Sequence, residues 1–281
     1  MRFLAMSRPS PGPSRGRNRH RRSTRVSRGS GLALLLAVSV PAHAQTVEDV
    51  VRRYLDARGG IVKLRSVQTL RLSGTMELPG VSAPFTLELK RPNRMRTEFT
   101  VEGQKGIRAF DGQVAWAQLP LPGERPRPMA PEEAVEARAQ ADVDLSPLVD
   151  ASAKGYAVEL VGRDRLPGGD TWKLFVRGPD GSRAMHLDAR THLVVQAEDR
   201  RKVDGQDVEF VTEIGDYRTV AGLVFPHRIE VGPKGSPERQ RLVIRKVEVN
   251  PPLDDARFAM PGAPPAARPP AKTRRAPAVL P

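Results

Sequence analysis

The sequence contains no cysteine, and only 5% of its 281 residues are aromatic. Without cysteine the chain has no disulfide, no thiolate-ligated metal, no thiol nucleophile and no cysteine for N-terminal acylation. Its apolar runs are also short, and none reaches the about 18–20 residues that a membrane-spanning helix requires. We therefore expect a single globular domain whose activity depends on its shape or on scattered polar side chains.

The net charge of +14 is confined to the two ends of the chain. Residues 1–29 contain nine arginines and no acid, and the segment from Arg268 to Arg275 adds three arginines and one lysine. These segments hold thirteen of the 46 cations, so the region between them has 33 cations against 32 acids. A surface that neutralises nucleic-acid phosphates requires an excess of positive charge. We therefore expect no nucleic-acid binding.

The N-terminal pattern is typical of a secretory signal peptide. A ten-residue apolar run, 31–40, follows the arginine-rich start, and the small residues Ala42 and Ala44 suit signal peptidase. The pattern predicts cleavage after Ala44 and release into the periplasm. The basic part, with its many prolines and serines, is unusually long, and we expect translation to begin near Val26.

The sequence after the cleavage site begins with an amphipathic helix. Thr46-Val-Glu-Asp49 resembles a capping box, apolar residues follow at helical spacing as far as Leu55, and Gly59-Gly60 ends the helix. A second short turn is expected at 61–64. A later helix is predicted over 131–140, which begins with proline and contains good helix formers.

From Val67 onward the hydrophobic period changes to two. Apolar and polar residues alternate from Leu70 to Leu78, from Phe85 to Lys90 and from Arg94 to Val101, as in antiparallel strands with one apolar and one wet face. A second series of strands, divided by glycine-containing turns, begins at Tyr156. The four prolines of 119–130 predict an irregular segment. The pattern predicts an α+β fold that is mainly antiparallel β, with about ten to eleven strands.

Motifs of catalytic and metal sites are missing or weak. The sequence after Ala44 has no Gly-x-Ser-x-Gly nucleophile motif, and Gly168-Gly169 joins two strands rather than opening a helix that could hold phosphate. His186, Asp188 and His192 have the chemistry of zinc ligands and lie near one predicted turn, but no further ligand is clustered with them. We expect no catalytic residue, no metal, no cofactor and no enzymatic activity. A hydrolase that uses His186 or His192 is the least favoured alternative.

Several segments between residues 46 and 261 together carry a family resemblance. The segment 51–67, followed by a strand with Gly74, has an opening helix, a glycine pair and a first strand in the family order. Further matching segments are Gly169–Leu174, Leu187–Leu193, Gly215–Gly222, Phe225–Arg228 and Phe258–Pro261. The chain thereby resembles the outer-membrane lipoprotein-sorting protein family, the LolA-like superfamily of periplasmic lipoprotein carriers.

The resemblance implies an incomplete, or half, β-barrel whose concave apolar face is covered by a few helices that act as a lid. It also implies a carrier or sensor that binds the acyl chains of a lipoprotein or another lipid in an apolar groove. The residues expected to bind lipid are the inward apolar side chains of the first half of the sheet, namely Leu72, Met76, Phe85, Leu87, Met95, Phe99 and Trp116. Four arginines could correspond to the one that contacts the lid in the family: Arg71, Arg94, Arg96 and Arg108.

An alternative from another class is a non-catalytic β-sheet interaction module of the cell envelope. It would bind a protein partner through an exposed sheet edge or through the basic C-terminal tail. In either case we expect a monomer with three parts: a signal peptide at 1–44, a LolA-like domain at 45–261, and a disordered tail rich in proline, alanine and arginine at 262–281.

Overall fold

The computed structural model describes residues 45–203 and 205–262. The predicted signal peptide, 1–44, and all but the first residue of the predicted tail, 262–281, lie outside the described residues. None of the helices in the described part is both long and apolar enough to span a bilayer.

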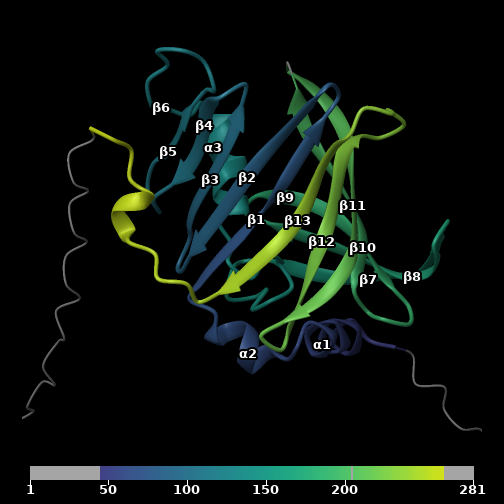
Figure 1. Cartoon of the computed structure of the whole chain (residues 1–281). Coiled ribbons are helices and arrows are strands. Elements are labelled where there is room, and N and C mark those ends of the chain that lie inside the picture. The colour runs from purple at the N-terminus through teal and green to yellow at the C-terminus, as the bar shows by residue number, and fades with distance from the viewer. Residues whose placement is uncertain (1–44, 204, 263–281) are drawn as a thin grey trace, which may run out of the picture. The chain divides into compact units, whose positions relative to one another are not determined.

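The described residues form one open antiparallel sheet of thirteen strands (Figure 1). The strands are β1 (Thr69–Leu78), β2 (Val81–Lys90), β3 (Arg94–Val101), β4 (Gln104–Phe110), β5 (Ala115–Gln118), β6 (Arg127–Pro128), β7 (Ala157–Leu166), β8 (Gly169–Gly178), β9 (Gly181–Asp188), β10 (Val194–Val203), β11 (Gln206–Val220), β12 (Leu223–Pro233) and β13 (Gln240–Val249). Their order is β6-β5-β4-β3-β2-β1-β13-β12-β11-β10-β9-β8-β7, so β1 and β13 join the two halves. The sheet does not close, because β6 and β7 pair on one side only. The predicted fold class, an open antiparallel sheet with few helices, is confirmed.

Two strands exceed the predicted count. β4 was not predicted, because apolar and polar residues do not alternate regularly along it. Gly106 and Arg108 lie on one face, while Ile107 and Ala109 are buried on the other. Glycine is required at 106, since a Cβ there would lie 2.4 Å from the ring of Phe99. β6 lies within the proline-rich segment that was predicted to be irregular. Proline is tolerated there because β6 is an edge strand.

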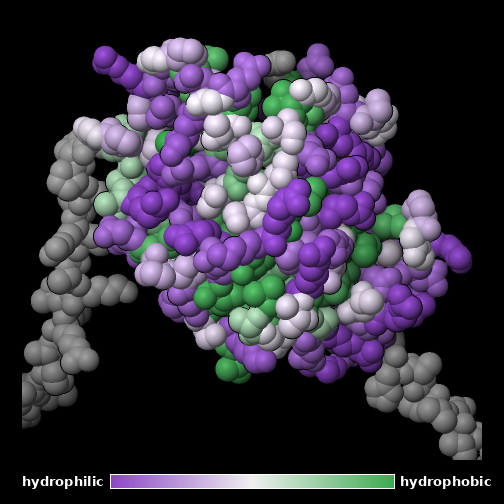
Figure 2. Space-filling model, in the orientation of Figure 1, coloured by the Kyte–Doolittle hydropathy of each residue, from purple (hydrophilic) through white to green (hydrophobic). Residues whose placement is uncertain are grey.

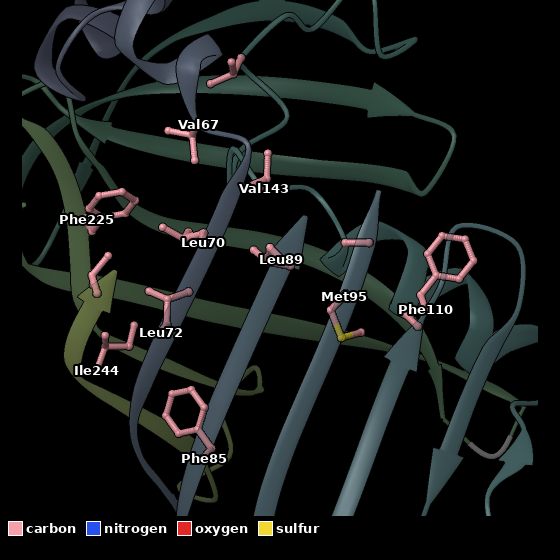
Figure 3. Packing of buried hydrophobic residues seen from close by; sticks show 14 of the residues in the cluster. Val67, Leu70, Leu72, Phe85, Leu89, Met95, Phe110, Val143, Phe225 and Ile244 are labelled. Carbon is pink, nitrogen blue, oxygen red and sulfur yellow. The ribbon is translucent and has the colours of Figure 1, made fainter. Parts of the chain in front are cut away.

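The inner face of the sheet is the one that carries Leu70, Leu72, Phe85, Leu89 and Met95, and it is strongly apolar. These side chains are between 0% and 6% exposed and belong to one core cluster. Figure 3 shows that they point to the same side of β1, β2 and β3, as Phe110 does from β4. A second cluster covers the inner face of the other half of the sheet. Its buried residues include Trp172, Leu174, Met185 and Leu187.

The predicted helices are present. α1 (Val47–Ala57) begins at Thr46, whose Oγ1 accepts a hydrogen bond from the N–H of Asp49 at 3.2 Å. α1 buries Val50 and Tyr54 against the second cluster. α2 (Ile61–Ser66) follows, and both helices lie at one end of the sheet (Figure 1). α3 (Pro131–Gln140) lies against the inner side of β3, β4 and β5.

The outer face is mostly polar, and hydrophilic residues cover most of the side shown in Figure 2. At β4 and β5, however, the outer face is covered by the outer strap, residues 251–260, which includes the 3₁₀ helix η1 (Asp255–Arg257). Phe258 in this strap is fully buried, and its carbonyl oxygen accepts a hydrogen bond from Nε1 of Trp116 at 2.8 Å. Ile107, Ala109 and Trp116 form a separate small core here, with Met260 against it.

Replacing Phe258 with alanine is expected to lower the free energy of unfolding by about 3–5 kcal/mol, because it empties a fully buried site. Equilibrium unfolding in urea measures the change. Val62→Ala is the control, since Val62 is 80% exposed. It is expected to change stability by less than about 0.5 kcal/mol. A loss of under about 1 kcal/mol in Phe258→Ala would mean that the strap is not part of the cooperative fold.

Candidate ligand-binding face

Six of the seven residues predicted to bind lipid lie together on the inner face. Cross-strand pairs join Leu72 to Leu87 and Phe85 to Phe99, and Met95 pairs with Leu89 in the same cluster. Met76 follows Leu72 by four residues on β1, so it points to the same side. Leu72, Phe85 and Met95 are buried, whereas Met76, Leu87 and Phe99 are only partly buried. The alternation in the sequence was sufficient to bring these six together.

Trp116 does not share this face, and the expectation that it points inward is wrong. On β5 the inward positions are Ala115 and Ala117, which belong to the inner cluster, while Trp116 packs with Ile107 and Ala109 on the outer face. Hydrophobicity alone could not reveal this, because the outer strap gives the outer face an apolar cover of its own.

Part of the inner face is covered by the inner loop, residues 141–155. Buried charges hold this loop in place. The side chain of Asp144 is 1% exposed; its Oδ1 lies 2.5 Å from Nη2 of Arg91 and its Oδ2 lies 2.7 Å from Nζ of Lys154. Lys154 also contacts both carboxylate oxygens of Asp142 at 2.8 Å. Burial raises the pKa of Asp142, although Lys154 acts in the opposite direction. Breaking such a network leaves a buried charge without a partner, so the loop is firmly anchored.

Arg58 extends this anchor to the end of α1. It is 4% exposed and lies over the rings of Tyr54 and Phe225. Its Nε donates to the carbonyl oxygen of Val224 at 2.8 Å, and Nη1 donates to the hydroxyl of Tyr54 at 2.7 Å. Nη2 donates to the carbonyl oxygen of Asp144 at 3.4 Å. One arginine therefore joins α1, β12 and the inner loop.

α3 is attached much more weakly than the inner loop. Its inward side chains are small: Ala137 is fully buried, and Ala134 is partly buried and packs against the inner core cluster. Small side chains remove little apolar area from water, so their packing contributes modestly. The larger Val135 is 46% exposed. α3 therefore covers apolar residues of the sheet without adding large apolar residues of its own.

The carboxylate of Glu136 on α3 contacts an arginine from each half of the sheet. Oε2 of Glu136 lies 3.5 Å from Nη2 of Arg108 on β4, and Oε1 lies 3.6 Å from Nη1 of Arg201 on β10. Gln140 donates to the same carboxylate at 3.1 Å. These groups are between 35% and 42% exposed, and ion pairs of this kind contribute about 0–1 kcal/mol each. The contacts therefore orient α3 but contribute little to the free energy that holds it on the sheet.

Of the four arginines considered for contact with a lid, Arg108 is the one that contacts α3. The other three lie on the outer face and pair there: Arg71 with Glu88, Arg94 with Asp255, and Arg96 with Glu98. Arg201 was missed by the sequence reasoning. Asp199 and Arg201 occupy inward positions of β10, so the apolar alternation that reveals an inward face is interrupted there.

Two cavities open at the rim of the sheet opposite the inner loop. Their volumes are about 240 and about 280 Å³. Both are below the about 300–1,000 Å³ that is typical of small-molecule sites. Neither cavity is lined by any of the seven residues predicted to bind lipid. α3 and the inner loop, by contrast, pack directly against the apolar inner face.

The three candidate zinc ligands do not form a site. His186 is 1% exposed, and its Nδ1 lies 3.5 Å from Oγ1 of Thr171. Asp188 accepts hydrogen bonds from the N–H groups of Arg190 and Thr191, and His192 occupies the positive-φ position of the same turn. In the described ranges, no three histidine, aspartate or glutamate residues lie close enough together to hold a metal ion.

The chain is similar to several solved structures, although no protein-family model and no curated protein sequence matches it. A DUF1329 family protein from Desulfovibrio piger superposes with a TM-score of 0.53 and 14% identity, covering 77% of this chain and 98% of that chain. A LolA superfamily protein from Nitrosomonas europaea gives 0.51 and 14% with the same coverage. An outer membrane lipoprotein-sorting domain from Vibrio parahaemolyticus gives 0.50 and 10%, covering 75% and 94%. The fold is therefore LolA-like.

The free energy of unfolding is expected to fall as the pH drops below about 6.5, the ordinary pKa of histidine. Burial, and next Lys173, lower the pKa of His186. The unfolded chain therefore takes up a proton that the folded protein refuses, so the stability contribution of His186 is complete above the unfolded pKa and is lost below it. Urea unfolding between about pH 7.5 and about pH 5 measures this slope.

His186→Gln is expected to flatten the pH dependence in this window, because the buried titrating ring is gone. His192→Asn is the matched control, since asparagine tolerates the positive φ of that turn and His186 remains in place. An unchanged slope in His186→Gln would show that another group causes the dependence.

Proposed function

We propose that this protein, with its LolA-like fold, binds the acyl chains of a lipoprotein or lipid against the inner face of its sheet. It would act as a periplasmic carrier or sensor of such molecules. The observation that carries the proposal is the nature of its cover: α3, a helix whose inward side chains are small and which is oriented by Glu136, lies on large apolar residues of the sheet. The signal-peptide pattern of residues 1–44 supports the location.

The energetics favour exchange between α3 and an acyl chain. Burial of each methylene group contributes about 0.8 kcal/mol, so one long chain can compensate for displacing a helix that buries only small side chains. Met76, Leu87 and Phe99 are only partly buried under the present cover and can accept further apolar contact. Since α3 and the ligand compete for one face, ligand binding selects the state in which α3 has moved.

The inner loop and α3, which together cover the inner face, differ in how firmly they are held. This difference indicates which of the two moves when a ligand binds. The inner loop is held by Asp144, whose carboxylate contacts Arg91 and Lys154 and is nearly inaccessible to solvent. α3 is held by half-exposed ion pairs. We expect the inner loop to stay in place as the floor of the groove while α3 opens as its lid.

A second candidate function, an envelope interaction module, is favoured by the edge of the sheet. β7 is ten residues long, pairs only with β8 among the described residues, and carries Val161 at 61% exposure. Such an edge can add a strand from a partner protein. Val161→Pro would abolish partner binding in that case, and lipid binding would be unaffected.

Phe99→Asp is expected to weaken the binding of a neutral acyl ligand by at least about tenfold, because a carboxylate on the inner face must lose its hydration. Displacement of a fluorescent fatty-acyl probe by a monoacylglycerol measures the affinity. Thr100→Asp is the matched control, since it adds the same charge one residue along β3, on the outer face. Equal affinities in the two variants would argue against an inner-face site.

Glu136→Gln is expected to tighten acyl binding by about two- to tenfold, since it removes two ion-pair contacts that hold α3 over the sheet. Hydrogen exchange of the amides in 131–140 should also become faster. Glu132→Gln, at an exposed position of the same helix, is the control and should change neither quantity. Slower exchange or weaker binding in Glu136→Gln would contradict a lid role for α3.

A further inference from the structure

Gln45 is the residue that follows the predicted cleavage site, and it lies one position before Thr46, at which α1 begins. Cleavage after Ala44 would give Gln45 a free α-amino group. We propose that Gln45 is a modification site, at which this amino group closes on the residue's own side chain to form pyroglutamate. The modification depends on the predicted cleavage and is independent of the proposed acyl-binding function.

The ring closure needs only atoms of Gln45. The neutral α-amino nitrogen attacks Cδ of the side-chain amide, so that a new C–N bond forms and the bond between Cδ and Nε2 breaks. Nε2 leaves as ammonia and takes with it the proton that the α-amino nitrogen loses. No oxidant or reductant is involved. Because α-amino groups titrate at about pH 8, a neutral and nucleophilic fraction is present at neutral pH.

The surroundings of the side chain favour the loss of its amide nitrogen. Gln45 is half-buried, and its Nε2 is buried without a hydrogen bond to any described residue. A buried amide donor without a partner destabilises the folded state. Ring closure releases this nitrogen as ammonia, so the unpaired donor leaves the protein.

The electrostatics of α1 also favour the ring. A free α-ammonium group at Gln45 would place a positive charge beside the positive end of the helix dipole, and ring closure removes this charge. The first turn contains two acids, but Asp49 is already paired with Arg52 at 2.6 Å. Glu48 is exposed, and exposed ion pairs contribute little. We therefore expect the cyclised N-terminus to make the first turn of α1 more stable.

The first turn matters because α1 is tied to distant parts of the fold. α1 buries Val50 and Tyr54 in the second cluster. Arg58, directly after the helix, donates to the carbonyl oxygens of Val224 on β12 and Asp144 in the inner loop. A cyclised N-terminus therefore protects the start of this helix against fraying. It also lacks the free amine that aminopeptidases require.

Mass spectrometry of the mature protein, purified from the periplasm of cells that express the full chain, tests the modification. Trypsin is expected to release residues 45–52 as an N-terminal peptide that is lighter by one ammonia than its linear form. Gln45→Asn is the matched control: asparagine has the same amide, but with one methylene fewer it would have to close a four-membered ring. Its N-terminal peptide should stay linear. A synthetic linear peptide of residues 45–52, carried through the same procedure, measures the ring closure that handling causes.

Hydrogen exchange tests the effect on α1. The amides of 49–51 are expected to exchange about two- to fivefold more slowly in the wild-type protein than in Gln45→Asn, which is the size of charge effects at helix ends. The amides of β1 are the internal control and should exchange equally in both proteins.

Each other outcome overturns a stated part of the proposal. A linear peptide that begins with Gln45 would refute the modification, and a mature N-terminus at any other residue would refute the cleavage site as well. Equal ring closure in the synthetic peptide would assign the ring to handling and so refute the modification. Ring closure with equal exchange of 49–51 in the two proteins would refute the effect on α1. None of these results bears on acyl binding, which Phe99→Asp tests separately.

Discussion

The central constraint on this structure is that a curled sheet with an apolar inner face must be covered by its own chain. The cover comes from two unequal pieces. The inner loop places Val143, Leu148 and Val149 into the core and is fixed there by buried ion pairs. α3 offers alanines and a half-exposed carboxylate. The two pieces therefore differ in attachment: the inner loop is held through a buried carboxylate, and α3 through a half-exposed one.

The two faces of the sheet use charge in different ways. On the outer face, the buried carboxylate of Glu88 lies between Arg71 and Arg257 and helps to hold the outer strap in place. On the inner face, Glu136 lies between Arg108 and Arg201 at longer distances and with more solvent access. Electrostatic attraction strengthens as solvent is excluded, so the first arrangement holds its partners more strongly than the second.

Much of the inner face could be predicted from the sequence, since side chains on a strand alternate with a period of two. That rule brought Leu72, Met76, Phe85, Leu87, Met95 and Phe99 together correctly. It failed at Trp116, because a strap more than 130 residues later in the chain covers the opposite face of β5. It also failed at β4, where both faces are buried and a glycine takes an inward position, so no alternation marks the strand.

The resemblance to the LolA-like family implied that the sheet is open and that helices cover it. By itself, the sequence determined antiparallel strands with one apolar face, an amphipathic first helix and a later helix at 131–140. These features follow from local periodicity and from turn and cap residues, which act over a few positions. Only the tertiary structure decided that Glu136 meets Arg108 and Arg201 and that Trp116 points outward. These contacts join residues far apart in the chain, and their geometry depends on how strongly the sheet curls.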